Sequence, residues 1–318
     1  MAAPLLWMPE GGPLWFPPVR DASDDGLLMV GGDLSPERLM YAYSRGIFPW
    51  YGEGSPILWW SPDPRCVLFP EKLHVSGSLR RVLNSGRFTF TVDACFCRVI
   101  RACAEIPRPG QDGTWIVPDM MAAYERLHEL GHAHSVEVWS SGELAGGLYG
   151  VQCGRAFFGE SMFHVQPDAS KAAVVHLTAW LRERGVEMVD CQQTTPHMLR
   201  LGAEEIPRSA FLAQLYRLCR EGRRRVHGRF RECGRRLCGV NSRPVRCVYR
   251  RENGAGGRVS VAAVAAGSEV LCTCNGALGR LRSRGRQTGR RVRRCGADAV
   301  LVRAGRDLRS PGDGQGSR

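Results

Sequence analysis

Three polar residues, Glu160, Asp190 and Gln192, stand in otherwise apolar stretches of the chain. Glu160 lies within FFGESMF, and the other two belong to VDCQ. A carboxylate in a buried strand is costly unless it has a partner. If the three side chains converge, they form a polar ligand site in an apolar wall. Otherwise backbone donors or arginines satisfy each acid separately, and the sequence leaves both possibilities open.

The segments around these residues predict a strand, a helix and a second strand. We expect the first strand over 155–163, the helix over 170–184 and the second strand over 186–192. Such a crossover usually makes the two strands parallel in one sheet. Asp190 and Gln192 are two residues apart, so they share a face of the second strand. Because ligands often bind at the carboxyl ends of parallel strands, the pattern favours a site there.

The wider pattern predicts a mixed α/β (α+β) fold with two domains and a tail. Residues 1–63 are rich in turns and tryptophan and suggest a small N-terminal domain. Strand and helix patterns alternate over 64–220, which predicts a larger sheet domain. Regular periodicity is lost over 221–318, where we expect a low-order tail.

The net charge of +13 comes entirely from that tail. Beyond residue 216 the chain has 26 arginines, no lysine and only 7 acidic residues, whereas the preceding part is mildly acidic. An arginine-rich arm could bind nucleic acid. The composition also fits a solvated, disordered extension or the out-of-frame reading of a GC-rich gene, and we favour these last two interpretations.

The sequence favours a protein of a reducing compartment without a metal. Its 13 cysteines follow no disulfide framework, which indicates free thiols. No C-x-x-C pairs have zinc spacing, and we expect no metal role for His132 and His134. There is no apolar run of about 18 residues and no secretory signal at the N-terminus, so we expect a cytoplasmic protein.

The predicted crossover unit invites comparison with GNAT-type acetyltransferases. Those enzymes need a glycine-bearing turn before the crossover helix, where backbone amides hold the pyrophosphate of coenzyme A. Here the connection is HVQPDAS, which contains no glycine. An acyl-CoA enzyme is therefore disfavoured, no cofactor is expected, and an acyl donor of another kind stays open.

Several longer motifs follow one another along the chain, among them GGDLSPERLMYAYSRGIFPWY, LWWSPDPRCVLFP, FFGESMF, VDCQ and LGAEEIPR. Over about residues 25–216 this ordered set closely resembles the leucyl/phenylalanyl-tRNA–protein transferase family. The resemblance implies a bacterial cytoplasmic aminoacyltransferase with a small N-terminal domain and a GNAT-like domain. Such an enzyme moves Leu or Phe, less often Met, from aminoacyl-tRNA to proteins that begin with Arg or Lys, and so marks them for N-degron degradation.

By this resemblance, the three polar residues lie where the acceptor amine attacks the aminoacyl ester. Gln192, oriented by Asp190, would hydrogen-bond the amine, and Asp190 and Glu160 would supply a negative field that suits a cationic acceptor. The remaining tasks are positioning, proton removal and stabilisation of the oxyanion. No serine or cysteine nucleophile is required, so we expect Cys191 to be structural and to face away from Asp190 and Gln192.

The resemblance also implies an apolar pocket and a stacking surface for the tRNA end. The pocket for the aminoacyl side chain would consist of Leu148, Phe157, Met162 and Val189. Trp50 and Trp115 would stack on the terminal adenosine. A local basic patch would hold the phosphates, and the candidates for it are Arg65, Arg80, Arg81 and Arg87.

Two alternatives stay open beside this assignment. The first is a relative that uses aminoacyl-tRNA with a different acceptor. The second is an RNA-binding protein that works through the arginine-rich tail.

Overall fold

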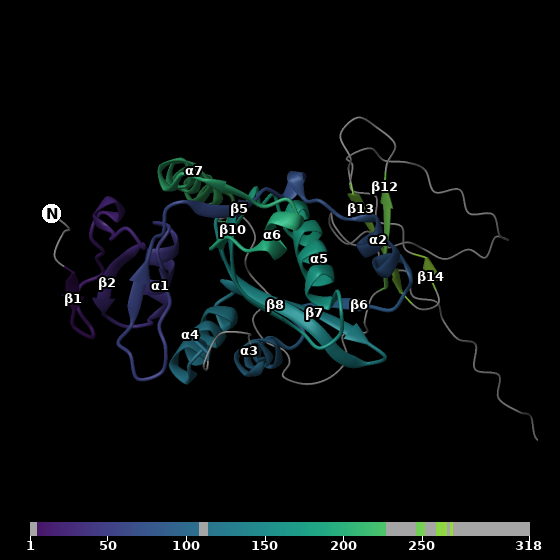
Figure 1. The fold of residues 1–318 in the computed structure, drawn as a ribbon, viewed down its shortest axis with the longest axis horizontal. Coiled ribbons are helices and arrows are strands. Elements are labelled where there is room, and N and C mark those ends of the chain that lie inside the picture. The colour runs from purple at the N-terminus through teal and green to yellow at the C-terminus, as the bar shows by residue number, and fades with distance from the viewer. Residues whose placement is uncertain (1–4, 108–113, 227–245, 252–258, 266–267, 270–318) are drawn as a thin grey trace, which may run out of the picture. The chain divides into compact units, whose positions relative to one another are not determined.

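A seven-stranded mixed sheet forms the centre of the fold in the computed structural model (Figure 1). The structure describes residues 5–107, 114–226, 246–251, 259–265 and 268–269. The strand order is β11-β5-β10-β9-β8-β7-β6, and within this sheet only β9 and β10 run parallel. The mixed α/β class expected from the sequence is confirmed.

The strands of this sheet are β5 (Arg65–Leu68), β6 (Thr89–Val92), β7 (Ala133–Ser140), β8 (Glu143–Cys153), β9 (Ala156–His164), β10 (Met188–Gln192) and β11 (Glu204–Ile206). Two of them, β9 and β10, match the segments expected at 155–163 and 186–192. Val189 pairs with Phe157 and Asp190 pairs with Phe158 in parallel register. The prediction that the crossover joins two neighbouring parallel strands is therefore confirmed.

Helices cover both faces of the sheet (Figure 1). One face packs against α3 (Phe96–Glu105) and α4 (Pro118–Glu129), and the other against α2 (Gly77–Asn84) and α5 (Ala169–Glu183). In α3, the buried residues Phe96, Val99, Ile100 and Cys103 follow the helical period, which turns one apolar stripe toward the sheet. Two separate cores result, one on each face.

The N-terminal part has its own four-stranded sheet and one helix. The strand order is β1-β2-β4-β3, and the elements are β1 (Leu6–Met8), β2 (Leu27–Gly31), α1 (Pro36–Tyr43), β3 (Phe48–Pro49) and β4 (Leu58–Trp60). Helix α1 begins at the Ser35 cap, whose hydroxyl accepts a hydrogen bond from the Arg38 backbone amide. Short 3-10 turns span Val19–Asp21 and Pro70–Lys72.

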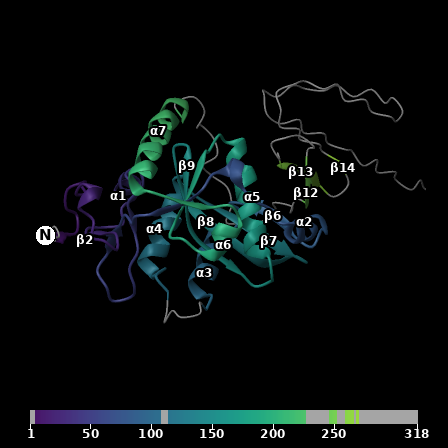
Figure 2. The ribbon, with the colours of Figure 1, turned by 45° about the horizontal axis from the view of Figure 1, so that its top comes forward.

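Helix α1 connects this part to the large sheet. It lies beside α4 in both views (Figure 1, Figure 2). At its C-terminal end the Tyr43 ring packs against the Phe158 ring of β9, with 4.8 Å between the ring centroids. The N-terminal part therefore contributes side chains to the same face of the sheet as α3 and α4.

The chain after β10 continues with α6 (Pro196–Arg200) and α7 (Arg208–Val226). Helix α7 runs past the boundary expected at residue 220. A three-stranded antiparallel sheet follows, made of β12 (Arg246–Arg251), β13 (Val259–Ala265) and β14 (Ser268–Glu269). The rest of the expected tail lies outside the described residues. Among the helices that the structure describes, none combines the length and apolar character needed to cross a membrane.

Candidate active site

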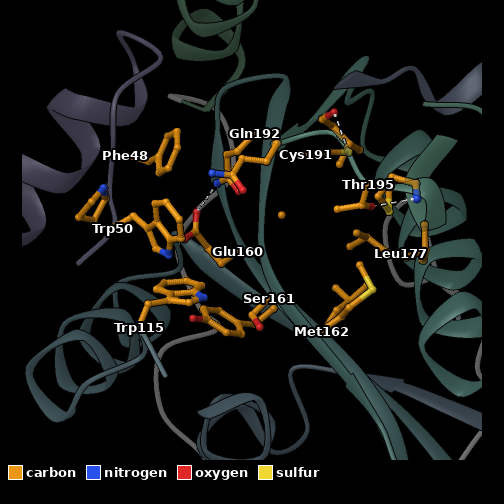
Figure 3. Close-up of a pocket in the computed structure, with 18 residues that line it drawn as sticks. Phe48, Trp50, Trp115, Glu160, Ser161, Met162, Leu177, Cys191, Gln192 and Thr195 are labelled. Carbon is orange, nitrogen blue, oxygen red and sulfur yellow. Dashed lines mark hydrogen bonds between the residues drawn. The ribbon is translucent and has the colours of Figure 1, made fainter. Parts of the chain in front are cut away.

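A cavity of about 290 Å³ opens where β9 and β10 separate (Figure 3). Their pairing ends at Phe158 and Asp190, and Glu160 and Gln192 follow on the diverging ends. The polar and aromatic side of the cavity includes Phe48, Trp50, Trp115, Glu160 and Gln192. The aliphatic side includes Leu148, Met162, Val174, Leu177, Val189 and Met198.

A β-bulge in β9 places Glu160 at this cavity. Tyr149 of β8 pairs with Ser161, and the next residue, Gly150, pairs with Gly159. Glu160 is therefore the extra residue on β9, which is the definition of a bulge. The bulge releases Glu160 from the regular ladder, and its side chain meets one partner from α1 and one from α4.

The same bulge changes the alternation of side chains along β9. Phe157 and Met162 are five residues apart, so a regular strand would turn them to opposite faces. Both belong to the core on the α5 face because one extra residue lies between them. The backbone is crowded here: a β-carbon on Gly150 would lie 2.1 Å from the carbonyl oxygen of Phe158. Glycine is therefore required opposite the bulge.

The carboxylate of Glu160 accepts three side-chain hydrogen bonds. Tyr43 donates to Oε1 at 2.8 Å, Tyr124 donates to Oε2 at 2.9 Å, and Gln192 Nε2 donates to Oε1 at 3.1 Å. Burial raises the pKa of Glu160 to about 7, and the charge of Asp190 acts in the same direction, while the three hydrogen bonds oppose the rise. Glu160 can therefore exchange a proton near neutral pH, beside the cavity it lines.

Asp190 is held differently, by a buried ion pair with Arg65 of β5. Arg65 donates from Nε to Oδ1 at 2.9 Å and from Nη2 to Oδ2 at 2.7 Å, and neither side chain is exposed. The guanidinium also lies over the rings of Phe48 and Phe211, at 4.9 and 4.6 Å from their centroids. Asp190 is not among the residues that line the cavity. Asp190 is paired with Arg65, so of the two acids only Glu160 presents its carboxylate to the cavity.

Gln192 reaches Glu160 through an unusual backbone conformation. Its φ is 59°, and the register against β5 shifts between Asp190 and Gln192. The backbone N–H of Gln192 donates a hydrogen bond to Asp190 Oδ1 at 2.9 Å, which fixes this left-handed turn. The prediction from regular alternation that Asp190 and Gln192 share a face is wrong, because Asp190 pairs with Arg65 and does not line the cavity, whereas Gln192 lines it. The structure brings Gln192 to Glu160 as expected, by a turn that Asp190 stabilises.

Three of the four residues expected in the apolar pocket line the cavity: Leu148, Met162 and Val189. Phe157 is fully buried and lies outside the lining. Cys191 faces the cavity from the aliphatic side. A hydrogen bond with Cys66 and burial raise the pKa of the Cys191 thiol well above its usual value, so Cys191 stays protonated and is a poor nucleophile.

Trp50 and Trp115 both line the cavity on the side of Glu160 (Figure 3). The carbonyl oxygen of Trp50 accepts a hydrogen bond from Trp60 Nε1 at 2.7 Å, and the two rings meet edge to face at 5.8 Å. Trp60 thereby fixes the backbone that carries Trp50. Trp59, in contrast, is buried in the N-terminal core.

The arginines proposed for phosphate contact divide into two groups. Arg65 is fully buried against Asp190, so its assignment to a surface patch is wrong. Arg81 and Arg87 are exposed and Arg80 is half-buried, on or just after α2; their contact with tRNA stays a prediction. Among the described residues, no group of three or more His, Cys, Asp or Glu side chains is placed to hold a metal ion.

Tyr43 and Tyr124 were not identified from the sequence. Each lies on the buried face of an amphipathic helix, where a tyrosine looks like an ordinary core residue. The one available signal is that a buried tyrosine hydroxyl usually needs a hydrogen-bond partner. Without the tertiary fold, that signal does not name Glu160 as the partner.

The mixed sheet carries a cavity with one carboxylate among apolar and aromatic side chains, and the comparisons with known proteins place the chain among the aminoacyltransferases. The model of the leucyl/phenylalanyl-tRNA protein transferase family matches residues 67–216, and the model of its N-terminal domain matches residues 32–63. The chain belongs to the leucyl/phenylalanyl-tRNA–protein transferase family.

Curated relatives of the same name agree with these matches. One from Nitratidesulfovibrio vulgaris (strain DP4) is 60% identical over 65% of this chain and 88% of its own. One from Anaeromyxobacter sp. (strain Fw109-5) is 62% identical over 64% of this chain and 86% of its own. A solved GCN5-related N-acetyltransferase from Kribbella flavida is also similar, at 13% identity over 54% of this chain and 61% of that one, with a TM-score of 0.32. A score this low carries no argument about function.

Proposed function

We propose that this protein transfers Leu or Phe, and less readily Met, from aminoacyl-tRNA to the N-terminal amine of proteins that begin with Arg or Lys. The modified proteins would enter N-degron degradation, and the reaction would take place in the cytoplasm. One observation carries the proposal: a single cavity joins two indole rings, a titratable carboxylate and an aliphatic lobe (Figure 3).

The donor would enter with its aminoacyl side chain in the aliphatic lobe. Met162 and Met198 line this lobe with Leu177, and methionine adapts to side chains of different shape. Trp50 and Trp115 would stack on the terminal adenosine, a contact worth about 1–3 kcal/mol per base. The cavity is close to the lower end of the ~300–1,000 Å³ range of small-ligand sites, so it fits the aminoacyl end of the tRNA and leaves the rest outside.

The reaction would join the acceptor nitrogen to the ester carbonyl carbon and break the bond from that carbon to the ribose oxygen. The nitrogen loses one proton, and the ribose oxygen gains one. The side-chain amide of Gln192 donates a hydrogen bond from Nε2 to Glu160, and its oxygen would accept a hydrogen bond from the incoming amine. Asp190 acts as a positioning residue, because it binds the backbone of Gln192 and does not line the cavity.

The preference for a cationic acceptor would come from Glu160. Within the described residues, no Lys or Arg pairs with its carboxylate, so the ionised form presents an uncompensated negative charge to the cavity. An Arg or Lys side chain beside the attacking amine would supply the missing positive charge.

The test is a transfer assay with purified full-length protein. Leu-, Phe- and Ile-charged tRNA are each incubated with a peptide that begins with Arg and with the same peptide beginning with Ala. We expect Leu and Phe on the Arg peptide only, with little transfer of Ile. If no Leu or Phe is transferred in an Arg-dependent way, the proposal is wrong. Equal transfer to the Ala peptide would instead identify a transferase with a different acceptor.

We infer, further, that residues 1–63 and 64–220 are the two domains that perform the transfer and that residues 221–318 are dispensable. The support is that the cavity described here is lined only by residues between Phe48 and Met198. Binding of RNA through the tail alone has no comparable support.

A further inference from the structure

Tyr43, Tyr124 and Glu160 form a closed triangle of oxygen contacts. The two phenol oxygens are 2.5 Å apart, and each phenol oxygen also contacts one carboxylate oxygen, at 2.8 Å for Tyr43 and 2.9 Å for Tyr124. The three side chains come from α1, α4 and β9. Neither tyrosine side chain is exposed, so water cannot replace any of these contacts at the phenol oxygens.

The number of hydrogens in this triangle depends on Glu160. When Glu160 is ionised, two phenol hydrogens must serve three oxygen contacts, and both point to the carboxylate. The phenol–phenol contact then has no hydrogen. When Glu160 carries a proton, there are three hydrogens for three contacts, and the ring closes: Oε2 donates to Tyr124, Tyr124 donates to Tyr43, and Tyr43 donates to Oε1. With the hydrogen bonds of the ring oriented in this way, Glu160 Oε1 still accepts the hydrogen bond from Gln192 Nε2.

We propose that Tyr43 and Tyr124 are positioning residues that, together with Glu160, form a single proton-exchanging unit of the active site. The unit changes from two donors on a carboxylate to a ring of three hydrogen bonds when it takes up a proton. This inference rests on the proposed transfer reaction only for its use in catalysis, because the ring itself is a property of the free protein.

The surroundings of the ring allow the proton to reside on Glu160 and keep it off the phenols. Burial raises the pKa of both tyrosines well above the usual value, so they remain donors. The pKa of Glu160 is about 7, so both forms of the ring occur near neutral pH. The other polar and charged groups that face the ring are Tyr149 of β8, Gln192 and Asp190 of β10, and Arg65 of β5, which neutralises Asp190.

In the transfer reaction the unit would move one proton and return it. As the acceptor nitrogen bonds to the ester carbon, it gives a proton to ionised Glu160, directly or through one water, and the ring closes. When the bond from carbon to the ribose oxygen breaks, Glu160 gives the proton to that oxygen, and the ring opens. The unit ends as it began, so no other proton donor or acceptor is consumed.

A double-mutant cycle tests the ring as a unit. The double variant Tyr43→Phe with Tyr124→Phe removes two charge-assisted hydrogen bonds from the ionised form and three neutral ones from the protonated form. Charge-assisted bonds are roughly twice as strong, so the titration midpoint of Glu160 should rise, by about one pH unit. Each single variant removes one charge-assisted bond from the ionised form but two neutral bonds from the protonated form, so its midpoint should stay nearly unchanged.

The primary measurement is the titration of the Glu160 carboxyl carbon by NMR in protein labelled with ¹³C-glutamate, assigned by comparison with Glu160→Gln. The midpoint of the acid limb of kcat/KM against pH is measured in parallel. Tyr41→Phe, two residues from Tyr43 on α1, is the control and should leave both midpoints unchanged. If each single variant raised the midpoint by half of the double-variant shift, the tyrosines would be independent donors, and the ring would be refuted. No shift in the double variant would refute it as well.

A second measurement needs no ring variant that could affect folding. In wild-type protein, the hydrogen-bond partners of the Tyr43 and Tyr124 hydroxyls change when Glu160 titrates. The aromatic Cζ carbons that bear these hydroxyls should therefore change chemical shift with pH, at the same midpoint as the Glu160 carboxyl carbon. Glu160→Gln should abolish the change, whereas a change that persists in Glu160→Gln overturns the inference. Because the NMR titrations need no tRNA, they can succeed even if the transfer assay finds no activity, so failure of the proposed function and failure of the ring are distinguishable.

Discussion

Arg65 and Asp190 hold each other through two parallel hydrogen bonds of 2.9 and 2.7 Å, and neither side chain has any exposed surface. The pair joins β5 to β10, and Asp190 stands between Val189 and Cys191, which line the cavity. It also separates the tasks of two neighbouring acids. Asp190 is neutralised and fixes the turn at Gln192, while Glu160 opens onto the cavity and titrates near neutral pH.

The first prediction concerns this pair. Asp190→Ala should destabilise the protein by about 3–5 kcal/mol, because it leaves the Arg65 charge buried without a partner. The free energy of unfolding from urea titration measures the loss. The double variant Arg65→Met with Asp190→Leu should recover most of the stability, since an apolar pair replaces the ion pair. It should not recover transfer, because the Gln192 turn has lost its acceptor. A double variant as active as wild type would show that Asp190 does not position Gln192.

The second prediction concerns stability as a function of pH. The pKa of Glu160 is raised from 4.5 to about 7 in the folded state, so between these values the native state binds more protons than the unfolded state. This contribution to stability is present below pH 4.5 and is lost as the pH rises through about 7. Relative to wild type, Glu160→Gln should therefore gain up to about 3 kcal/mol between pH 4.5 and 8.

The comparison with Glu160→Gln is needed because another group acts in the opposite direction. Burial lowers the pKa of His176 from 6.5 to about 4, so its contribution to stability rises with pH over part of the same range. Wild-type stability alone can thus look flat. The difference between the two proteins cancels the His176 contribution. A difference that does not change with pH would contradict the raised pKa of Glu160.

The third prediction concerns the tRNA end. Trp115→Ala should weaken binding of aminoacyl-tRNA by about 1–3 kcal/mol, the value of one stacked base, and should lower the single-turnover rate at saturation much less. Filter binding and single-turnover kinetics separate the two effects. Trp180→Ala is a suitable control, because Trp180 is half-buried on α5 and does not line the cavity. Equal weakening in both variants would argue against stacking on Trp115.

The fourth prediction concerns the choice between Leu and Phe. Leu177→Phe narrows the aliphatic lobe, so transfer of Phe should fall about tenfold relative to transfer of Leu, which is within the ~1–3 kcal/mol that pocket shape provides. Competition between the two charged tRNAs measures the ratio. Leu199→Phe makes the same substitution at an exposed position of α6 and should leave the ratio unchanged. An unchanged ratio in Leu177→Phe would show that the aminoacyl side chain binds outside the aliphatic lobe.

The fifth prediction concerns the C-terminal part. A chain that ends at Val226, the last residue of α7, should keep the kcat/KM of transfer, because no residue beyond Met198 lines the cavity described here. The transfer assay with matched charged tRNA compares it with the full chain. If the shortened chain lost activity although its circular dichroism spectrum showed a folded protein, the arginine-rich segment would be assigned a role in tRNA binding.

Some elements of the fold could be predicted because they have a local signal, whereas the short strands β1 to β4 and β11 and the sheet of β12, β13 and β14 were not expected. Helix α1 has the Ser35 cap followed by Pro36, and the parallel pair β9 and β10 follows from the length of the crossover between them. The polar residues of the site stand out in the sequence as polar side chains within apolar runs. In each case, neighbouring residues in the sequence carry the information.

The geometry of the site could not be predicted in the same way. The bulge at Glu160 depends on how β8 lies against β9, and regular alternation would have separated Phe157 from Met162. The left-handed turn at Gln192 depends on a hydrogen bond to Asp190. The partner of Asp190 is 125 residues away in the chain. Such contacts between distant residues leave no local pattern in a single sequence.

Tyr43 belongs to one of the first helices of the chain. Its hydroxyl donates a hydrogen bond to Glu160, and Glu160 accepts another from Gln192, so both partners come from much later in the chain. On a ribosome, the N-terminal part emerges long before these later residues. The polypeptide therefore cannot assemble its active centre until β10 and α6 have left the exit tunnel. A growing chain of this protein would be inert toward the charged tRNAs that surround it during its own synthesis.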